Sequence, residues 1–113
     1  MGVHLSIIIA VLDEAENVLP VCRELASVLP QLPETEVIFV DAGSTDRTVA
    51  CLQEARDAVL PGLRILSHDR RRGKSAALRT GIEAARGHWI ATLDGDGQDN
   101  PNALLDMLRQ AQG

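Results

Sequence analysis

Aromatic side chains are scarce in this 113-residue chain, which has no tyrosine and only Phe39 and Trp89 of the aromatic class. Stacked aromatic rings that would hold the bases of a single strand therefore cannot be built in the usual way. The net charge of −5 agrees with this, because nucleic-acid backbones select basic surfaces. The sequence predicts no nucleic-acid partner.

Long apolar runs and paired cysteines are lacking as well. The longest wholly apolar run, Ile7 to Leu12, is far shorter than the roughly 20 residues that cross a bilayer as a helix. The N-terminus has no basic region followed by an apolar core, so no signal peptide is predicted. Cys22 and Cys51 have no ligand-like spacing, which favours two reduced thiols over a disulfide or a metal site. We expect no membrane span in this chain and a cytoplasmic location.

Strand-like and helical patterns alternate along the chain. Apolar, β-branched runs predict strands at 5–11, 36–40, 63–66 and 88–93. Amphipathic spacing predicts helices at about 13–29, 45–60, 75–85 and 101–112, the first capped by Asp13 and the second by Ser44 or Thr45. This alternation, with short connections, predicts an α/β fold in which four parallel strands alternate with four helices.

Each chemically interesting cluster follows a predicted strand. Asp13 and Glu14 follow the first strand, Asp41 ends the second, residues 70–74 follow the third, and Asp94 with Asp96 follows the fourth. In open α/β sheets the ligand crevice lies outside the carboxyl ends of the strands, where the chain order reverses. We therefore expect the four clusters to meet at one edge of the sheet.

The last cluster has the chemistry of a metal–phosphate site. Asp94, Asp96 and Gln98 offer side-chain oxygens at alternate positions, and the intervening glycines let the backbone turn so that these oxygens converge. Mg²⁺ or Mn²⁺ bound there would bridge substrate phosphates. An EF-hand is excluded, because Asp99 and Leu105 stand where that loop needs glycine and glutamate.

The other clusters have a structural explanation beside the functional one. Asp41 can accept a hydrogen bond from the ring N–H of a nucleobase, or it can simply build the turn into the next helix. Residues 70–74 can face a pyrophosphate or form a solvated turn; they are not a P-loop, because His68 stands where glycine is required. Asp13 and Glu14 can hold ribose hydroxyls, although helix capping alone explains Asp13.

Four stretches together resemble the family-2 glycosyltransferases of the GT-A fold, particularly the dolichyl- or polyprenyl-phosphate sugar synthases. In order, they are Ile9 to Asn17, Val40 to Thr48, Arg72 to Gly81 and Leu93 to Pro101. The resemblance implies a Rossmann-like fold, specifically the nucleotide-diphospho-sugar-binding half of a GT-A domain. The sequence departs from the family pattern at Ala10, Asp13 and Ala42, where the family commonly has proline, asparagine and a second aspartate, respectively.

The resemblance also implies an activity. It is the metal-dependent, inverting transfer of a hexose from a GDP- or UDP-sugar to an acceptor such as polyprenyl or dolichyl phosphate, which would place the reaction at the cytoplasmic face of the membrane. The cofactor implied is Mg²⁺ or Mn²⁺. The implied site residues are Val11, Asp13, Glu14, Asp41, Arg72, Lys74 and Asp94 for the donor, Asp94 and Asp96 for catalysis, and Asp96 and Gln98 for the metal.

Enzymes of this kind continue for roughly as long again. Residues 1–113 therefore correspond to the donor-nucleotide-binding part, with the acceptor half absent, and we do not expect turnover by this chain alone. The alternative is a non-catalytic nucleotide-sugar-binding module or an inactive fragment. A phosphoacceptor receiver domain is poorly supported, because no fifth strand is predicted. A sheet cut short has an unpaired edge, which allows self-association.

Overall fold

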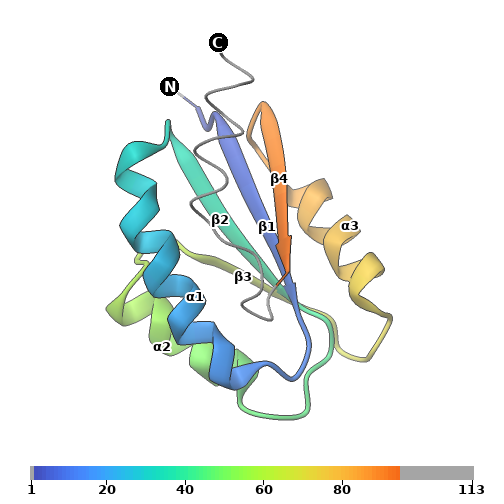
Figure 1. The fold of residues 1–113 in the computed structure, drawn as a ribbon. Coiled ribbons are helices and arrows are strands. Elements are labelled where there is room, and N and C mark those ends of the chain that lie inside the picture. Colours follow the sequence, from blue (N-terminus) through green and yellow to red (C-terminus); the bar gives the residue numbers. More distant parts are fainter. Residues whose placement is uncertain (1, 95–113) are drawn as a thin grey trace.

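A single parallel sheet organises the part of the chain that the computed structural model describes, residues 2–94. Its strands follow the order β3-β2-β1-β4 (Figure 1). In chain order the elements are β1 (Leu5–Val11), α1 (Ala15–Val28), the short 3₁₀ helix η1 (Leu29–Gln31), β2 (Thr35–Asp41), α2 (Thr48–Ala58), β3 (Arg64–Ser67), α3 (Lys74–Ala84) and β4 (Trp89–Asp94). The predicted α/β fold with four parallel strands is confirmed; the helix expected after Asn100 lies outside the described residues.

β1 is buried along its whole length, as its run of β-branched residues predicts. It pairs with β2 on one side and with β4 on the other. Alternate side chains point to opposite faces of the sheet. Ile7 and Ile9 therefore join the core on one face, while Ile8 and Ala10 join the core on the other.

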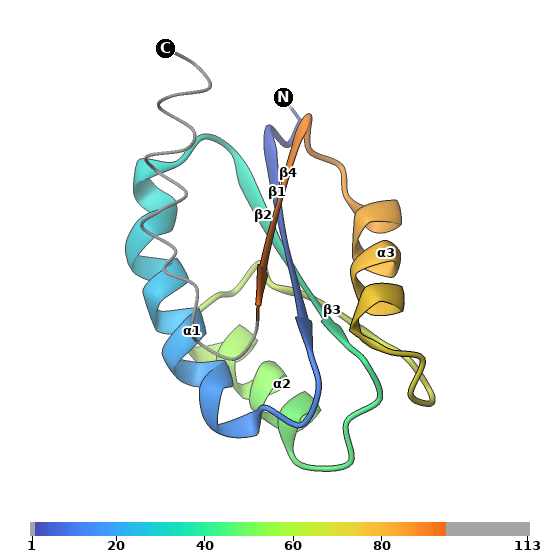
Figure 2. The same cartoon turned by 45° about the vertical axis from the view of Figure 1, so that its right-hand side comes forward.

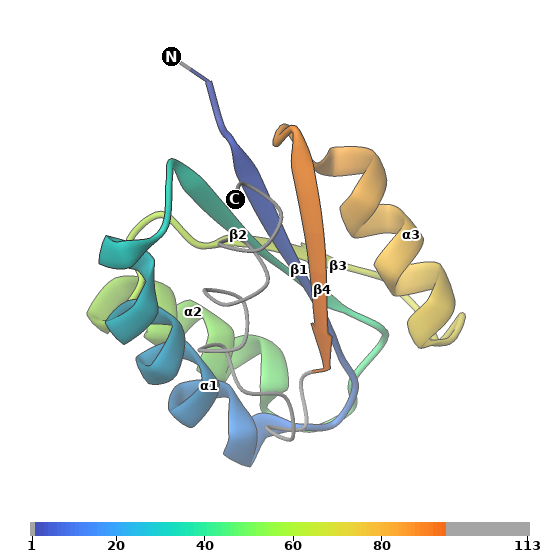
Figure 3. The same cartoon turned by 45° about the horizontal axis from the view of Figure 1, so that its top comes forward.

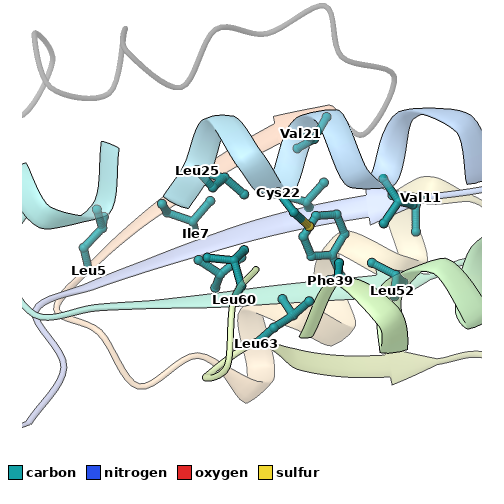
Figure 4. Packing of buried hydrophobic residues seen from close by; sticks show 14 residues of the cluster. Leu5, Ile7, Val11, Val21, Cys22, Leu25, Phe39, Leu52, Leu60 and Leu63 are labelled. Atoms are coloured by element: carbon teal, nitrogen blue, oxygen red, sulfur yellow. The ribbon is translucent and has the colours of Figure 1, made fainter. Parts of the chain in front are cut away.

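The helices cover the two faces unequally. α1 and α2 lie side by side on one face, and α3 covers the other (Figures 2 and 3). The larger core lies beneath α1 and α2, where Cys22 and Leu52 gather around Phe39 (Figure 4). Cys22 and Cys51 are both free, the first buried and the second partly buried, and burial raises the pKa of the Cys22 thiol to about 12.

Small residues let α3 approach the sheet closely. A Cβ atom built at Gly81 would lie 2.4 Å from Cγ2 of Ile8 and 3.1 Å from Cγ2 of Val40. Ala77, one turn earlier, is fully buried on the same side of the helix. Lys74 is the first residue of α3, so the packing of Ala77 and Gly81 on the sheet also fixes the distance of Lys74 from the sheet.

Gly81→Ala should lower the free energy of unfolding by about 1–3 kcal/mol, because the added methyl group overpacks the contact with β1. Gly62→Ala is the matched control, since a Cβ built there has no neighbour within 4 Å. Urea unfolding of the two variants measures the difference. Equal midpoints would show that α3 does not approach the sheet as closely as described.

Two predicted helix starts are wrong. α1 begins at Ala15 after Glu14, which makes no side-chain cap, so Asp13 is not the N-cap. α2 begins at Thr48 rather than near Thr45, and neither Ser44 nor Thr45 caps it. In both cases the polar side chains bond across to another loop instead of to their own helix, as described below.

Glu36 is the centre of a partly buried polar cluster at the amino ends of the strands. Its carboxylate accepts hydrogen bonds from Ser6 Oγ at 2.6 Å, the Arg86 backbone N–H at 2.7 Å and Arg64 Nη1 at 2.8 Å. Burial tends to raise the pKa of Glu36, but these hydrogen bonds and the Arg64 charge outweigh it and lower the pKa. The cluster lies at the opposite end of the strands from the predicted site.

β4 lies at the edge of the described sheet and exposes apolar surface. Trp89 is 51% exposed and Ile90 is 44% exposed. Self-association through this edge stays a prediction. Within residues 2–94, no helix is both long and apolar enough to cross a bilayer.

Candidate functional site

The carboxyl ends of all four strands meet at one edge of the sheet. Val11 pairs with Asp41, Asp41 pairs with Ser67, and Ala10 pairs with Asp94. The chain order reverses between β1 and β4, which is where open α/β sheets bind ligands (Figure 3). We name the three connections that follow β1, β2 and β3 loop 1 (residues 12–14), loop 2 (residues 42–47) and loop 3 (residues 68–73).

Loop 2 and the start of α2 satisfy the first N–H group of α1 and the two N–H groups that precede it. Three successive N–H groups have side-chain acceptors more than thirty positions along the chain. The hydrogen bonds run from Asp13 to Ser44 Oγ at 2.8 Å, from Glu14 to Thr48 Oγ1 at 3.0 Å, and from Ala15 to Asp46 Oδ2 at 3.4 Å. These long-range bonds replace the local cap that the sequence predicts.

Asp13 binds loop 2 in return. Its Oδ1 accepts the N–H of Thr45 at 2.7 Å and that of Asp46 at 3.3 Å. The Thr45 and Asp46 N–H groups point to loop 1, so α2 starts only at Thr48. Asp46 in turn accepts hydrogen bonds from the Thr48 hydroxyl and the Thr48 backbone N–H, and these lower its pKa.

Asp41 combines features of the two roles that the sequence left open, building the turn into the next helix and accepting a hydrogen bond from a nucleobase. The residue is only 2% exposed. Its Oδ2 accepts the N–H groups of Gly43 at 3.2 Å and Ser44 at 3.1 Å, and so builds the turn of loop 2. Its Oδ1 is buried and has no hydrogen-bond partner among the described residues. One oxygen therefore shapes the loop, and the other is available to a ligand that presents an N–H or O–H group.

Loop 3 and the first residue of α3 each bring a cation to loop 1. Arg71 forms an ion pair with Asp13 Oδ2, and Lys74 Nζ lies 2.9 Å from Glu14 Oε1. The Glu14 side chain is 13% exposed, and its Oε2 is buried without a hydrogen-bond partner among residues 2–94. Sequence patterns did not single out Arg71 from its neighbours. A single-residue step along an irregular loop changes which side chain faces inward.

Arg72, which the resemblance assigns to the donor, pairs within loop 3 and not with loop 1. It pairs with Asp69 at 3.6 Å, and both side chains are more than half exposed. An ion pair of this kind contributes little to stability, so Arg72 can leave Asp69 at little cost. Its role in donor binding stays a prediction.

His68 is held between loop 3 and α3. The Thr80 hydroxyl donates to the Ala76 carbonyl, so His68 Nε2, 2.8 Å from Thr80 Oγ1, is the donor in that contact. Its backbone N–H donates to the Asp41 carbonyl at 2.9 Å. His68 thus anchors the start of loop 3 beside Asp41.

Gly43 of loop 2 lies close against the backbone of loop 3. It has a φ of +102°, and a Cβ built there would lie 2.8 Å from the Arg71 backbone nitrogen. Gly43→Ala should therefore destabilise the chain by about 1–3 kcal/mol more than Gly73→Ala, because only the first substitution adds a backbone clash to the cost of a positive φ. Gly73 has a φ of +93° with no neighbour within 4 Å. Equal losses in urea unfolding would argue against this close approach.

Of the remaining predicted residues, Val11 lies in the sheet, and the others stand at or beyond the end of the described chain. Val11 ends β1 with its side chain in the core, and its carbonyl accepts the N–H of Ala42 at 2.8 Å. Asp94 is the last residue of β4, and Asp96 and Gln98 lie outside the described residues. Among residues 2–94, no three His, Cys, Asp or Glu side chains are grouped to hold a metal ion. The metal site stays a prediction.

The sheet order, the helix arrangement and the rim of loops define the Rossmann-like half of a GT-A glycosyltransferase fold. Residues 6–113 match the model of glycosyl transferase family 2, so the chain belongs to that family.

Relatives and solved structures agree with this assignment. Dodecaprenyl-phosphate galacturonate synthase of Rhizobium johnstonii is 33% identical over 98% of this chain and 33% of its own length. TarS 1-349 of S. aureus superposes with a TM-score of 0.80 at 21% identity, over 96% of this chain and 32% of that one. The mannosyltransferase PcManGT of Pyrobaculum calidifontis, in complex with GDP-Man and Mn²⁺, superposes with a TM-score of 0.70 at 27% identity. The match covers 82% of this chain and 27% of that one. The chain thus spans about a third of the length of these proteins.

Proposed function

We propose that residues 1–113 form the donor-nucleotide-binding part of a metal-dependent, inverting glycosyltransferase. The donor is a hexose linked to UDP or GDP, and the acceptor is polyprenyl phosphate. The observation that carries the proposal is the pair of buried carboxylate oxygens, Asp41 Oδ1 and Glu14 Oε2, that have no hydrogen-bond partner among the described residues at the sheet edge. Buried acceptors in native proteins are normally satisfied, so their position marks a ligand site.

Asp41 suits the nucleobase. A carboxylate accepts N–H groups and donates none, and both uracil and guanine carry a ring N–H. Asp41 is held by the N–H groups of Gly43 and Ser44, so its free oxygen is fixed in direction before any ligand arrives. Fixing the oxygen in advance lowers the entropy lost on binding.

Glu14 and Lys74 suit the ribose and the diphosphate. Glu14 Oε2 can accept a ribose hydroxyl while Oε1 stays with Lys74. Lys74 is also the first residue of α3, whose N-terminus favours anions through its unpaired N–H groups. Arg72 lies two residues earlier and adds positive charge on the same loop.

The metal would be held by Asp96 and Gln98, next to Asp94. Carboxylate and amide oxygens are the ligands that Mg²⁺ and Mn²⁺ prefer, and β4 delivers Asp94 to the sheet edge beside the end of β1. A bound cation would neutralise charge on the leaving diphosphate. The presence of Mn²⁺ and GDP-Man in the PcManGT complex supports this assignment.

The acceptor determines whether a base is needed. A phosphate oxygen of polyprenyl phosphate is already ionised at neutral pH, so it can attack the anomeric carbon without losing a proton to the protein. The new carbon–oxygen bond forms as the bond to the nucleoside diphosphate breaks, and a single displacement inverts the anomeric centre. The name of the Rhizobium johnstonii relative, a dodecaprenyl-phosphate galacturonate synthase, supports this class of acceptor. Such an acceptor would place the reaction at the cytoplasmic face of the membrane.

Donor binding can be measured by calorimetry with UDP or GDP and Mn²⁺ on the 113-residue chain. Asp41→Asn should weaken the preferred nucleotide by about tenfold, which corresponds to loss of one charge-assisted hydrogen bond. Asp96→Ala should abolish the part of the affinity that depends on Mn²⁺. Exposed Asp57 of α2 provides the control, and Asp57→Asn should bind like the wild type.

Equal Mn²⁺-dependent affinity in the wild type and in Asp96→Ala would contradict the metal assignment. Transfer is tested separately, with labelled donor and polyprenyl phosphate in a protein that also carries an acceptor half. Nucleotide binding without transfer there would identify a non-catalytic binding module instead.

A further inference from the structure

We propose that Asp13 is a positioning residue, which holds loop 2 against loops 1 and 3 so that Asp41 presents its free oxygen to the nucleotide. This assignment replaces the donor contact that the family resemblance implies for Asp13. The test by nucleotide affinity rests on the proposed function, whereas the test by amide hydrogen exchange does not.

The hydrogen bonds of Asp13 distinguish it from the other two carboxylates of the rim. Asp41 and Glu14 each keep one buried oxygen without a partner among the described residues. Asp13 keeps none: Oδ1 accepts the Thr45 and Asp46 N–H groups, and Oδ2 pairs with Arg71. A nucleotide contact at Asp13 would share an oxygen that already has a partner, whereas contacts at Asp41 and Glu14 would satisfy buried acceptors that have none within residues 2–94.

The backbone of Asp13 is also specialised. Asp13 has a φ of +50° and is the only residue other than glycine with a positive φ among residues 2–94. L-residues avoid this region, and aspartate and asparagine tolerate it best. The conformation directs the Asp13 N–H to Ser44 Oγ while the side chain bonds to the next two residues of loop 2. Loop 1 and loop 2 are therefore joined through both the backbone and the side chain of one residue.

A short path of contacts links Asp13 to Asp41, whose free oxygen we assign to the nucleobase. Asp13 fixes Ser44, Thr45 and Asp46, and the N–H groups of Gly43 and Ser44 fix Asp41 Oδ2. Gly43 in turn lies against the backbone of Arg71, whose side chain returns to Asp13. Removal of the Asp13 side chain should release loop 2, and with it the direction of the Asp41 carboxylate.

Three substitutions separate the possible roles. Asp13→Gly keeps the positive φ and removes the side chain. Asp13→Asn keeps the positive φ and the Oδ1 acceptor but removes the charge. Asp13→Ala removes the side chain and disfavours the backbone conformation. Asp57→Asn, on the exposed side of α2, is the control for a lost carboxylate charge.

The measurements are nucleotide affinity by calorimetry with UDP or GDP and Mn²⁺, and amide hydrogen exchange of Thr45 and Asp46 by NMR without nucleotide. We expect Asp13→Gly to weaken the affinity by about tenfold and to speed both exchange rates by about tenfold, because the hydrogen bonds to loop 2 are lost. Asp13→Ala should lose at least as much. Asp13→Asn should stay within about threefold of the wild type in both, since its Oδ1 still accepts the same N–H groups.

Two results would overturn the proposal. If Asp13→Asn loses as much affinity as Asp13→Gly while its amide exchange is unchanged, the charge contacts the ligand directly. If Asp13→Gly behaves like the wild type in both measurements, the side chain holds nothing in place. If Asp13→Gly does not fold, the nucleotide affinity and amide exchange of Asp13→Asn alone test the proposal. A wild type that binds no nucleotide would refute the proposed function, and the exchange rates would still test the role of Asp13.

Discussion

β1 is hydrogen-bonded along both edges and buried on both faces, and the position of every other element follows from this constraint. β2 and β4 lie on either side of it, so the chain must cross over, and the order of the strands reverses beside β1. Parallel pairing then brings the ends of all four strands to one edge. The predicted ligand site needs no dedicated scaffold, because the same pairing that buries Ile7, Ile8 and Ile9 also gathers the loops.

Reciprocal polar contacts join the loops at that edge to one another, in addition to the apolar packing of Leu12 and Ala42 on the sheet. Loop 1 donates its N–H groups to loop 2, and Asp13 accepts N–H groups from loop 2. Arg71 of loop 3 and Lys74 of α3 offset the negative charge of Asp13 and Glu14. In a chain of net charge −5, this local pairing keeps a concentration of carboxylates from repelling the phosphates of a ligand.

The sequence predicted what depends on local pattern. Buried runs such as Leu5 to Val11 and the spacing of Val18, Cys22 and Leu25 indicate strand and helix without reference to the rest of the chain. Prediction from the sequence failed where the hydrogen bonds of one loop are made by a different loop. Asp13 has the local signature of an N-cap, yet its partners are 32 and 33 positions away. Nothing in the sequence around Glu36 predicts its hydrogen bonds to Ser6, Arg64 and Arg86 either, because these residues meet only after the sheet has formed.

The two unpartnered oxygens explain how such a rim could be selective. An acceptor left buried without a partner costs about 1–3 kcal/mol relative to a satisfied one. A ligand that brings an N–H to Asp41 and an O–H to Glu14 removes both costs, whereas a ligand that presents an acceptor there leaves them in place and adds repulsion. Selectivity in this arrangement comes from rejection as much as from attraction. It also requires that Asp41 cannot turn to satisfy itself, and the two loop 2 N–H groups on its other oxygen prevent this.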